Sequence, residues 1–193
     1  MMQWAEPLQI VRIVVDVLDS LRIPYLIGGS LASSLHGIPR ATLDADLVVE
    51  LSMPHVEPFT SALAKDFYMD TAAMREAIRN RSSFNLIHLQ TLFKVDIYVL
   101  KDDDFSRNEM DRRERVGIEE ETGRDLFVAS AEDTLLHKLF WFQAGGGVSE
   151  RQWRDVMGIL RVQGEKLDRA YLERIAKSTG VKGLLERAYH ESK

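Results

Sequence analysis

The sequence predicts an α/β (α+β) protein in which a small mixed β-sheet is flanked by helices and followed by a C-terminal helical region. Two observations predict this class. In the first two thirds of the chain, short apolar runs typical of strands alternate with segments whose apolar residues recur at helical spacing. From residue 130 onward only the helical spacing remains. We therefore expect a core domain over residues 1–128 and a helical region over residues 129–193.

The composition bounds the class of protein. The chain has 193 residues, of which 45% are hydrophobic, and a formal net charge of −5. Because a broad nucleic-acid binder is usually basic, any RNA contact needs a local patch, for which residues 112–115 are the best candidate. The absence of cysteine excludes disulfides and fits a reducing cytosol, so we expect a cytoplasmic protein. The apolar runs are too short for a transmembrane helix, and Arg12 and Asp16 interrupt the segment that a signal peptide would need.

The N-terminal elements follow from apolar spacing and from turn residues. Residues 7–21 repeat apolar side chains at helical spacing, and residues 25–27 form a short apolar run that predicts a strand. Gly28 and Gly29 then mark a tight turn. A short helix over residues 31–35 follows, with Ser30 placed to cap it, and it ends at Gly37 and Pro39.

The middle of the chain predicts alternating strands and helices. A strand starts at Asp44, and helices are expected up to Lys65 and over residues 71–79. Residues 84–89 and 92–100 alternate apolar and polar side chains, which predicts an antiparallel pair.

The last third predicts a surface helix, a hairpin and a helical region. The surface helix covers residues 104–115, and the hairpin closes across residues 121–123. Ser130, Ser149 and Asp168 are each placed to cap a helix of the C-terminal region.

The glycine turn is the first candidate site. Gly28, Gly29 and Ser30 join a buried strand to a helix, so backbone N–H groups at the helix N-terminus are available to an anion such as a phosphate. A tight strand–helix turn without a ligand is the plainer interpretation.

Three aspartates form the second candidate site. Asp44 and Asp46 stand two residues apart on an extended segment, so their side chains leave the same face. Asp96 lies in the middle of an apolar strand, where a carboxylate is costly unless it is paired or binds a cation. If the two strands are neighbours, the three carboxylates converge within metal-bridging distance and suit one or two divalent cations. The alternatives are a pair between Asp46 and Arg40 and an ion pair of Asp96 with Lys94 or an arginine.

Together these residues resemble the nucleotidyltransferase fold of the polymerase-beta superfamily. The resemblance covers residues 25–99: Gly-Gly-Ser, a short helix, Asp-x-Asp at a strand start, and a later strand aspartate. Arg40-Ala-Thr-Leu-Asp-Ala-Asp is most similar to the AbiEii-type nucleotidyltransferases, which are toxins of bacterial type IV toxin–antitoxin systems. The segments around Lys138 and Asp155 are similar to two helices of that family, but Gly158 stands where the family has a second aspartate.

The resemblance implies transfer of a nucleoside monophosphate from an NTP to an acceptor hydroxyl with Mg²⁺ (or Mn²⁺). It implies that Asp44, Asp46 and Asp96 hold the metal, with Asp96 also a candidate to accept the hydroxyl proton. The implied NTP-binding residues are those of the turn and of the helical side of the cleft: Gly28, Gly29, Ser30, Arg40, Lys138 and Asp155. Asp155 orients Lys138 in this scheme, and a structural helix–helix ion pair is the alternative.

The resemblance leaves the acceptor open. By analogy with AbiEii-type relatives the acceptor is RNA, in particular tRNA, and the chain has a cognate antitoxin partner. Aminoglycoside-type nucleotidyltransferases share the same motifs and imply a small-molecule acceptor instead. A degenerate, non-catalytic interaction protein is the third possibility, which Gly158 favours and the three aspartates oppose.

Overall fold

The computed structural model describes residues 5–117 and 125–192, which form two compact units. The first unit comprises residues 1–28 and 41–128, and the second comprises residues 29–40 and 129–193. The chain passes from the first unit to the second directly after Gly28, returns after Arg40, and passes over again after Val128. The short segment of residues 29–40 therefore groups with the C-terminal helices.

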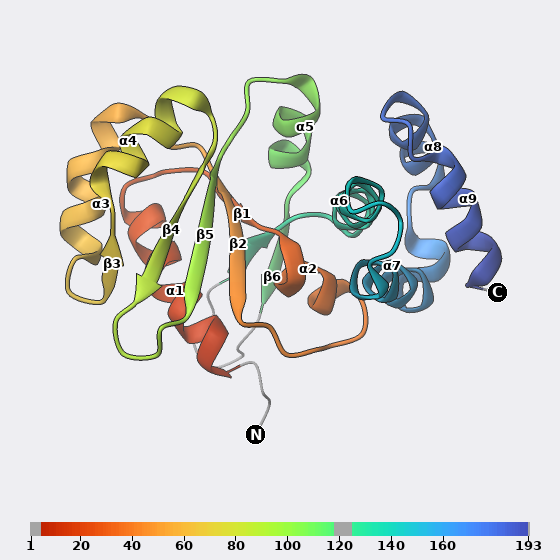
Figure 1. Ribbon diagram of the computed structural model, residues 1–193, viewed down its shortest axis with the longest axis horizontal. Helices are drawn as coiled ribbons and strands as arrows, with labels where there is room; N and C mark the ends of the chain where they lie inside the picture. Colours follow the sequence, from red (N-terminus) through yellow and green to blue (C-terminus); the bar gives the residue numbers. More distant parts are fainter. Residues whose placement is uncertain (1–4, 118–124, 193) are drawn as a thin grey trace. The chain divides into compact units, whose positions relative to one another are not determined.

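The first unit contains a mixed β-sheet, which confirms the predicted α/β class (Figure 1). Within the described residues the strand order is β3-β4-β5-β2-β1-β7-β6. The pairs β2–β5 and β1–β7 are parallel, and the other neighbours are antiparallel. The strands are β1 (Tyr25–Ile27), β2 (Asp44–Val49), β3 (Phe67–Met69), β4 (Ser83–His88), β5 (Lys94–Val99), β6 (Glu114–Gly117) and β7 (Asp125–Val128).

Helices cover the apolar side of this sheet. Alternate residues of β2 and β5 are fully or almost fully buried, among them Leu47 and Ile97, while the residues between them are half-buried. Helix α1 contacts β2 and α3, and α4 contacts α3 and β4. The helical elements of the unit are α1 (Ala5–Ser20), η1 (Met53–His55), α3 (Val56–Leu63), α4 (Thr71–Asn80) and α5 (Asp104–Arg112).

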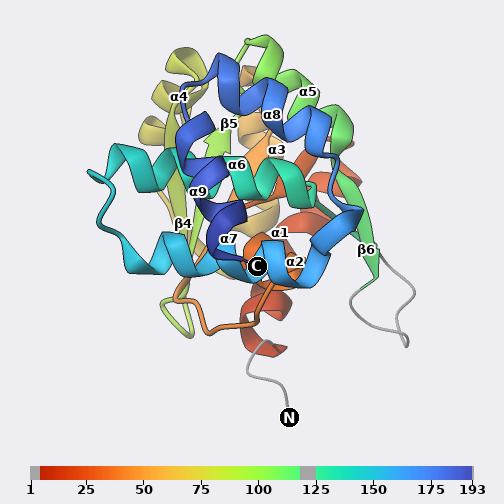
Figure 2. The same cartoon turned by 90° about the vertical axis from the view of Figure 1, so that its right-hand side faces the viewer.

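The second unit is a helical bundle (Figure 2). Helix α2 packs against α6 and α7. Helix α8 packs against α6, α9 packs against α7, and α8 and α9 pack against each other. Its elements are α2 (Gly29–His36), α6 (Ala131–Ala144), α7 (Glu150–Gln163), η2 (Gly164–Lys166), α8 (Arg169–Ser178) and α9 (Lys182–Glu191). Ser130, Ser149 and Asp168 accept hydrogen bonds from backbone N–H groups at the starts of α6, α7 and α8, which confirms all three predicted caps.

The structure differs from the sequence prediction at several elements. Strand β3 was not predicted, because three residues are too few for an alternation to be recognised and its pairing with β4 is a tertiary contact. Helix α2 begins at Gly29, so Ser30 lies inside the first turn instead of capping it. The antiparallel pairs β4–β5 and β6–β7 confirm both predicted hairpins, although residues 121–123 lie outside the described residues.

None of the helices in the described part of the chain has the length and apolar character needed to cross a membrane.

The end of α2 approaches α7 more closely than side chains would allow. A Cβ atom built on Gly37 would lie 2.8 Å from the Ile159 nitrogen and 2.8 Å from the Ser33 oxygen, both backbone atoms. A Cβ atom on Gly158 would lie 3.1 Å from the Ile38 nitrogen. Glycine at both positions thus lets the turn after α2 lie directly on the backbone of α7.

We expect Gly37→Ala to destabilise the protein by about 2 kcal/mol, because backbone atoms cannot move aside as a flexible side chain can. Urea unfolding measures the change. Gly183→Ala is the matched control: no atom lies within 4 Å of its Cβ position in α9, so alanine should stabilise the helix by roughly 0.5–1 kcal/mol. Equal stabilities of the two variants would contradict the close packing.

Candidate functional site

The three predicted aspartates lie on one face of the sheet of the first unit. In the parallel pair β2–β5, Asp46 is the direct partner of Asp96, and Asp44 is the partner of Lys94. Directly paired residues project to the same side of a sheet, and so do residues two apart on one strand. Asp44, Asp46 and Asp96 therefore share a face, which we call the carboxylate face.

Gly28 lies at the same level of the sheet. Its N–H donates a hydrogen bond of 2.8 Å to the Asp46 carbonyl oxygen, which extends the β1–β2 ladder by one residue. The following residue, Gly29, has a φ of +56°, a backbone conformation that favours glycine. The sequence thus turns away from the sheet beside Asp46, as the Gly-Gly pair predicts.

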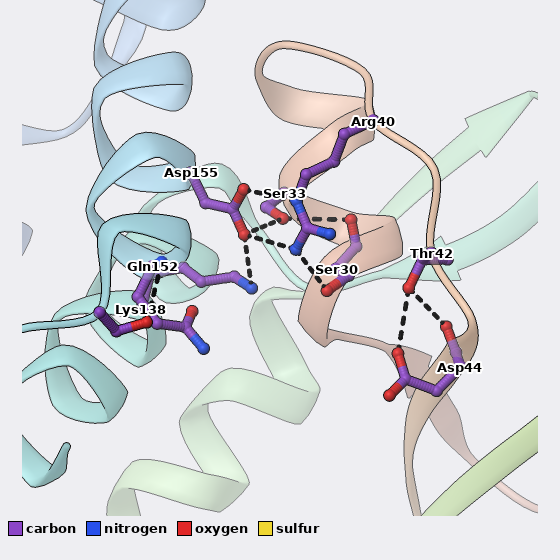
Figure 3. A network of polar contacts seen from close by, with 9 residues as sticks. Ser30, Ser33, Arg40, Thr42, Asp44, Lys138, Gln152 and Asp155 are labelled. Atoms are coloured by element: carbon purple, nitrogen blue, oxygen red, sulfur yellow. Dashed lines mark hydrogen bonds and ion pairs between the residues drawn. The ribbon is translucent and has the colours of Figure 1, made fainter.

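Each carboxylate of the face has its own protein partner. The Thr42 hydroxyl lies 3.0 Å from Oδ1 of Asp44 and donates to it (Figure 3). The Lys94 ammonium forms an ion pair of 2.7 Å with Oδ2 of Asp96, which was one of the alternatives that the sequence left open. The Tyr98 hydroxyl hydrogen-bonds to Asp46.

The electrostatics of the face follow from these contacts. The hydrogen bond to Asp96 raises the pKa of the Lys94 ammonium, and the charges of Asp44 and Asp46 add to this effect. Burial raises the pKa of Tyr98 to about 12, and the charges of Asp46 and Asp96 act in the same direction. The face therefore carries an excess of negative charge that favours cations.

The predicted convergence of all three carboxylates is not present in this structure. Over residues 5–117 and 125–192, no group of three or more histidine, cysteine, aspartate or glutamate side chains is arranged to hold a metal ion. Asp44, Asp46 and Asp96 instead contact Thr42, Tyr98 and Lys94, respectively. The donor set itself suits Mg²⁺, since these side chains offer only oxygen atoms from neighbouring positions of one face.

The second unit contains a cluster of opposite charge around Asp155 on α7, which we call the Asp155 cluster (Figure 3). Arg40 donates from Nε to Oδ1 of Asp155 at 2.8 Å and from Nη2 to Oδ2 at 2.9 Å. The Lys138 ammonium on α6 lies 2.9 Å from Oδ2, and the Ser33 hydroxyl donates to the same oxygen at 3.2 Å. Ser30 accepts a hydrogen bond of 2.6 Å from Arg40 Nη2. The sequence-predicted residues Ser30, Arg40, Lys138 and Asp155 thus meet in one network.

Asp155 forms ion pairs with two cations, Arg40 and Lys138. The side chains of Lys138 and Asp155 are only 5% and 4% exposed, whereas Arg40 is 21% exposed. Burial alone would raise the pKa of Asp155, but the hydrogen bonds and charges of Arg40 and Lys138 outweigh it and hold the pKa below its ordinary value. Arg40 also contacts Ser30 in the first turn of α2, and cations beside a helix N-terminus suit an anion.

Gly158 has a packing role in this structure. It faces the backbone of the turn at Ile38, so an aspartate there would collide with that turn. Glycine at this position therefore fits the close packing within the second unit.

Sequence reasoning assigned no role to three of the residues in these two networks. They are Ser33, Thr42 and Tyr98. The alternation of β5 already placed Tyr98 on the face of Asp96, and Ser33 follows Ser30 by one helical turn. The missing information was which side chain each of them contacts.

Asp155→Asn is expected to destabilise the protein by about 3 kcal/mol at pH 7, because two buried or half-buried cations lose their anion. The folded-state pKa of Asp155 is depressed, so its contribution is present above the unfolded carboxyl pKa of about 4 and is lost as the pH falls through the lower folded pKa. Urea unfolding between pH 7 and pH 3 should show the difference from wild type shrinking at the acidic end. Exposed Glu165→Gln is the control, and a difference that does not change with pH would contradict this assignment.

Comparison with known proteins gives matches among solved structures. No family model matches the sequence, and no curated protein matches it. The chain is similar to ANT(2'')-Ia, solved in complex with adenylyl-2''-tobramycin, at 10% identity and a TM-score of 0.56, covering 96% of this chain and 99% of that one.

Two further structures give the same result. A nucleotidyltransferase-like protein from Paracoccidioides brasiliensis matches at 21% identity and a TM-score of 0.52, with 92% of this chain and 90% of that one covered. The lincosamide antibiotic adenylyltransferase LnuA, solved with lincomycin, matches at 15% identity and a TM-score of 0.51, with 76% and 91% covered. At these identities the likeness concerns the fold, and this chain has the nucleotidyltransferase fold.

Proposed function

We propose that this protein is a nucleotidyltransferase that moves a nucleoside monophosphate from an NTP to an acceptor hydroxyl and releases pyrophosphate. The observation that carries the proposal is the pairing of Asp46 with Asp96 in adjacent parallel strands, on the face that also presents Asp44. The fold shared with known nucleotidyltransferases supports it. In this proposal Asp44, Asp46 and Asp96 hold Mg²⁺ or Mn²⁺.

The proposed role of each side chain follows from its charge. When bound, the metal neutralises phosphate oxygens and polarises the phosphorus that is attacked. Asp96 is the candidate to accept the proton of the acceptor hydroxyl, since it is 18% exposed and its ion pair with Lys94 is at the surface. Arg40 and Lys138 bind triphosphate oxygens through their positive charge, and Asp155 positions both of them.

The glycine turn contributes backbone donors to the same substrate. Gly29 and Ser30 form the first turn of α2, whose N–H groups are not used by the helix itself. We assign these N–H groups and the Ser30 hydroxyl to the phosphates of the NTP, and Gly28 to the close approach of the backbone.

Asp46→Asn should lower NTP turnover by at least about 100-fold, since phosphoryl-type transfer depends on charge neutralisation by the held metal. Pyrophosphate release with each of the four NTPs and Mg²⁺ measures this. Exposed Asp111→Asn on α5 is the charge-matched control and should retain full turnover. If Asp46→Asn binds NTP with Mg²⁺ as well as wild type, the chain is a non-catalytic protein of this fold.

We propose a small molecule as the acceptor in the first instance. The observation that favours it is the match, over almost the full length of both chains, to an enzyme solved with an adenylylated aminoglycoside. The net charge of −5 also disfavours a polyanionic acceptor.

RNA is the second candidate acceptor. Arg113 and Arg115 both stack on the Phe127 ring, at 4.7 and 5.3 Å from its centroid, and place positive charge at one edge of the sheet. An RNA acceptor would agree with the AbiEii-type resemblance, with a bacterial toxin role and with an antitoxin partner in the cytoplasm.

Labelled NTPs incubated with aminoglycosides, lincosamides and tRNA in parallel should label a small molecule and leave tRNA unlabelled. Arg115→Gln should not change the rate with a small-molecule acceptor. Labelling of tRNA that is lost in Arg115→Gln would replace the small-molecule assignment with the RNA acceptor.

A further inference from the structure

Lys94 occupies a position on the carboxylate face that the proposed reaction does not use. The strand β5 presents Lys94, Asp96 and Tyr98 in succession on this face, and Lys94 is also the direct cross-strand partner of Asp44. Its side chain therefore neighbours two of the proposed metal ligands. Asp44 is its cross-strand partner, and Asp96 lies two residues further along β5.

The ion pair of Lys94 takes up an oxygen that a metal would need. Nζ lies 2.7 Å from Oδ2 of Asp96, which is hydrogen-bond distance. A divalent cation coordinated by the same oxygen would lie within a few ångströms of the ammonium, and the two positive charges would repel each other. The ammonium therefore competes with a metal for the electron density of this oxygen.

The exposure of Lys94 indicates that its ammonium can move away from Asp96 into solvent. The Lys94 side chain is 43% exposed, and it is an unbranched flexible chain whose head group is readily solvated. Half-exposed ion pairs of this kind are weak, so a bound metal would displace the ammonium at a small cost.

We infer that Lys94 is an internal counter-cation of the carboxylate face, which neutralises the metal-free site and weakens metal binding by direct competition at Asp96. The inference rests on the proposed function, because it concerns the metal that the transfer requires. Its consequence is that the free chain binds Mg²⁺ weakly, and that metal arrives more readily together with a triphosphate that supplies additional oxygen ligands.

Mn²⁺ titration of the full chain, followed by calorimetry and by the electron paramagnetic resonance of free Mn²⁺, tests the inference without any turnover. Lys94→Met and Lys94→Gln should bind Mn²⁺ about tenfold more tightly than wild type. The glutamine variant keeps a hydrogen-bond donor for Asp96 and removes only the charge. Lys101→Met, which removes a charge roughly 20 Å further along the same strand direction, should bind as wild type does.

Thermal unfolding gives a second measurement. In EDTA the Lys94 variants should unfold at a lower temperature than wild type, since the carboxylates lose their counter-charge. Added Mn²⁺ should raise their midpoint by more than it raises that of wild type, because tighter binding gives greater stabilisation.

The outcomes separate the two proposals. Saturable Mn²⁺ binding that is lost in Asp46→Asn but unchanged or weaker in both Lys94 variants overturns the role of Lys94 and leaves the proposed function standing. Wild-type chain that binds no Mn²⁺, alone or with NTP, overturns both.

Discussion

The packing of the second unit depends on the contacts of the buried Asp155 carboxylate. It accepts hydrogen bonds or ion pairs from three segments: Ser33 on α2, Arg40 just after α2, and Lys138 on α6. Removing it would leave two cations facing each other in a mostly buried place. Because the proposed function assigns the same two cations to the phosphates of the NTP, the stability of this unit and the proposed substrate binding both depend on Asp155.

The two units contain different networks of charged side chains. The carboxylate face of the first unit holds three carboxylates, which contact Lys94, Thr42 and Tyr98. In the Asp155 cluster of the second unit, Arg40 and Lys138 both form ion pairs with Asp155. In the proposed function, Asp44, Asp46 and Asp96 hold the metal, and Arg40 and Lys138 bind triphosphate oxygens.

The sequence was informative wherever the structure is local. Period-two alternation predicted β2, β4 and β5, and cap residues predicted the starts of α6, α7 and α8, because both signals depend on the neighbouring residues alone. It was uninformative about β3, which exists only through its pairing with β4, and about the partner of Ser30. The ion pair of Lys138 with Asp155 was predicted only through the resemblance, since 17 positions of sequence on two helices do not fix a contact.

The placement of α2 has a consequence for how the chain can be divided and made. Residues 29–40 belong with the C-terminal helices, and Arg40 meets a partner 115 residues later in the chain. A fragment that stops at Val128 would contain α2 without the two helices that cover it, so the N-terminal two thirds are not a separable domain. During synthesis the sheet can pair early, whereas α2 can be packed only after the helices of residues 129–193 have been synthesised.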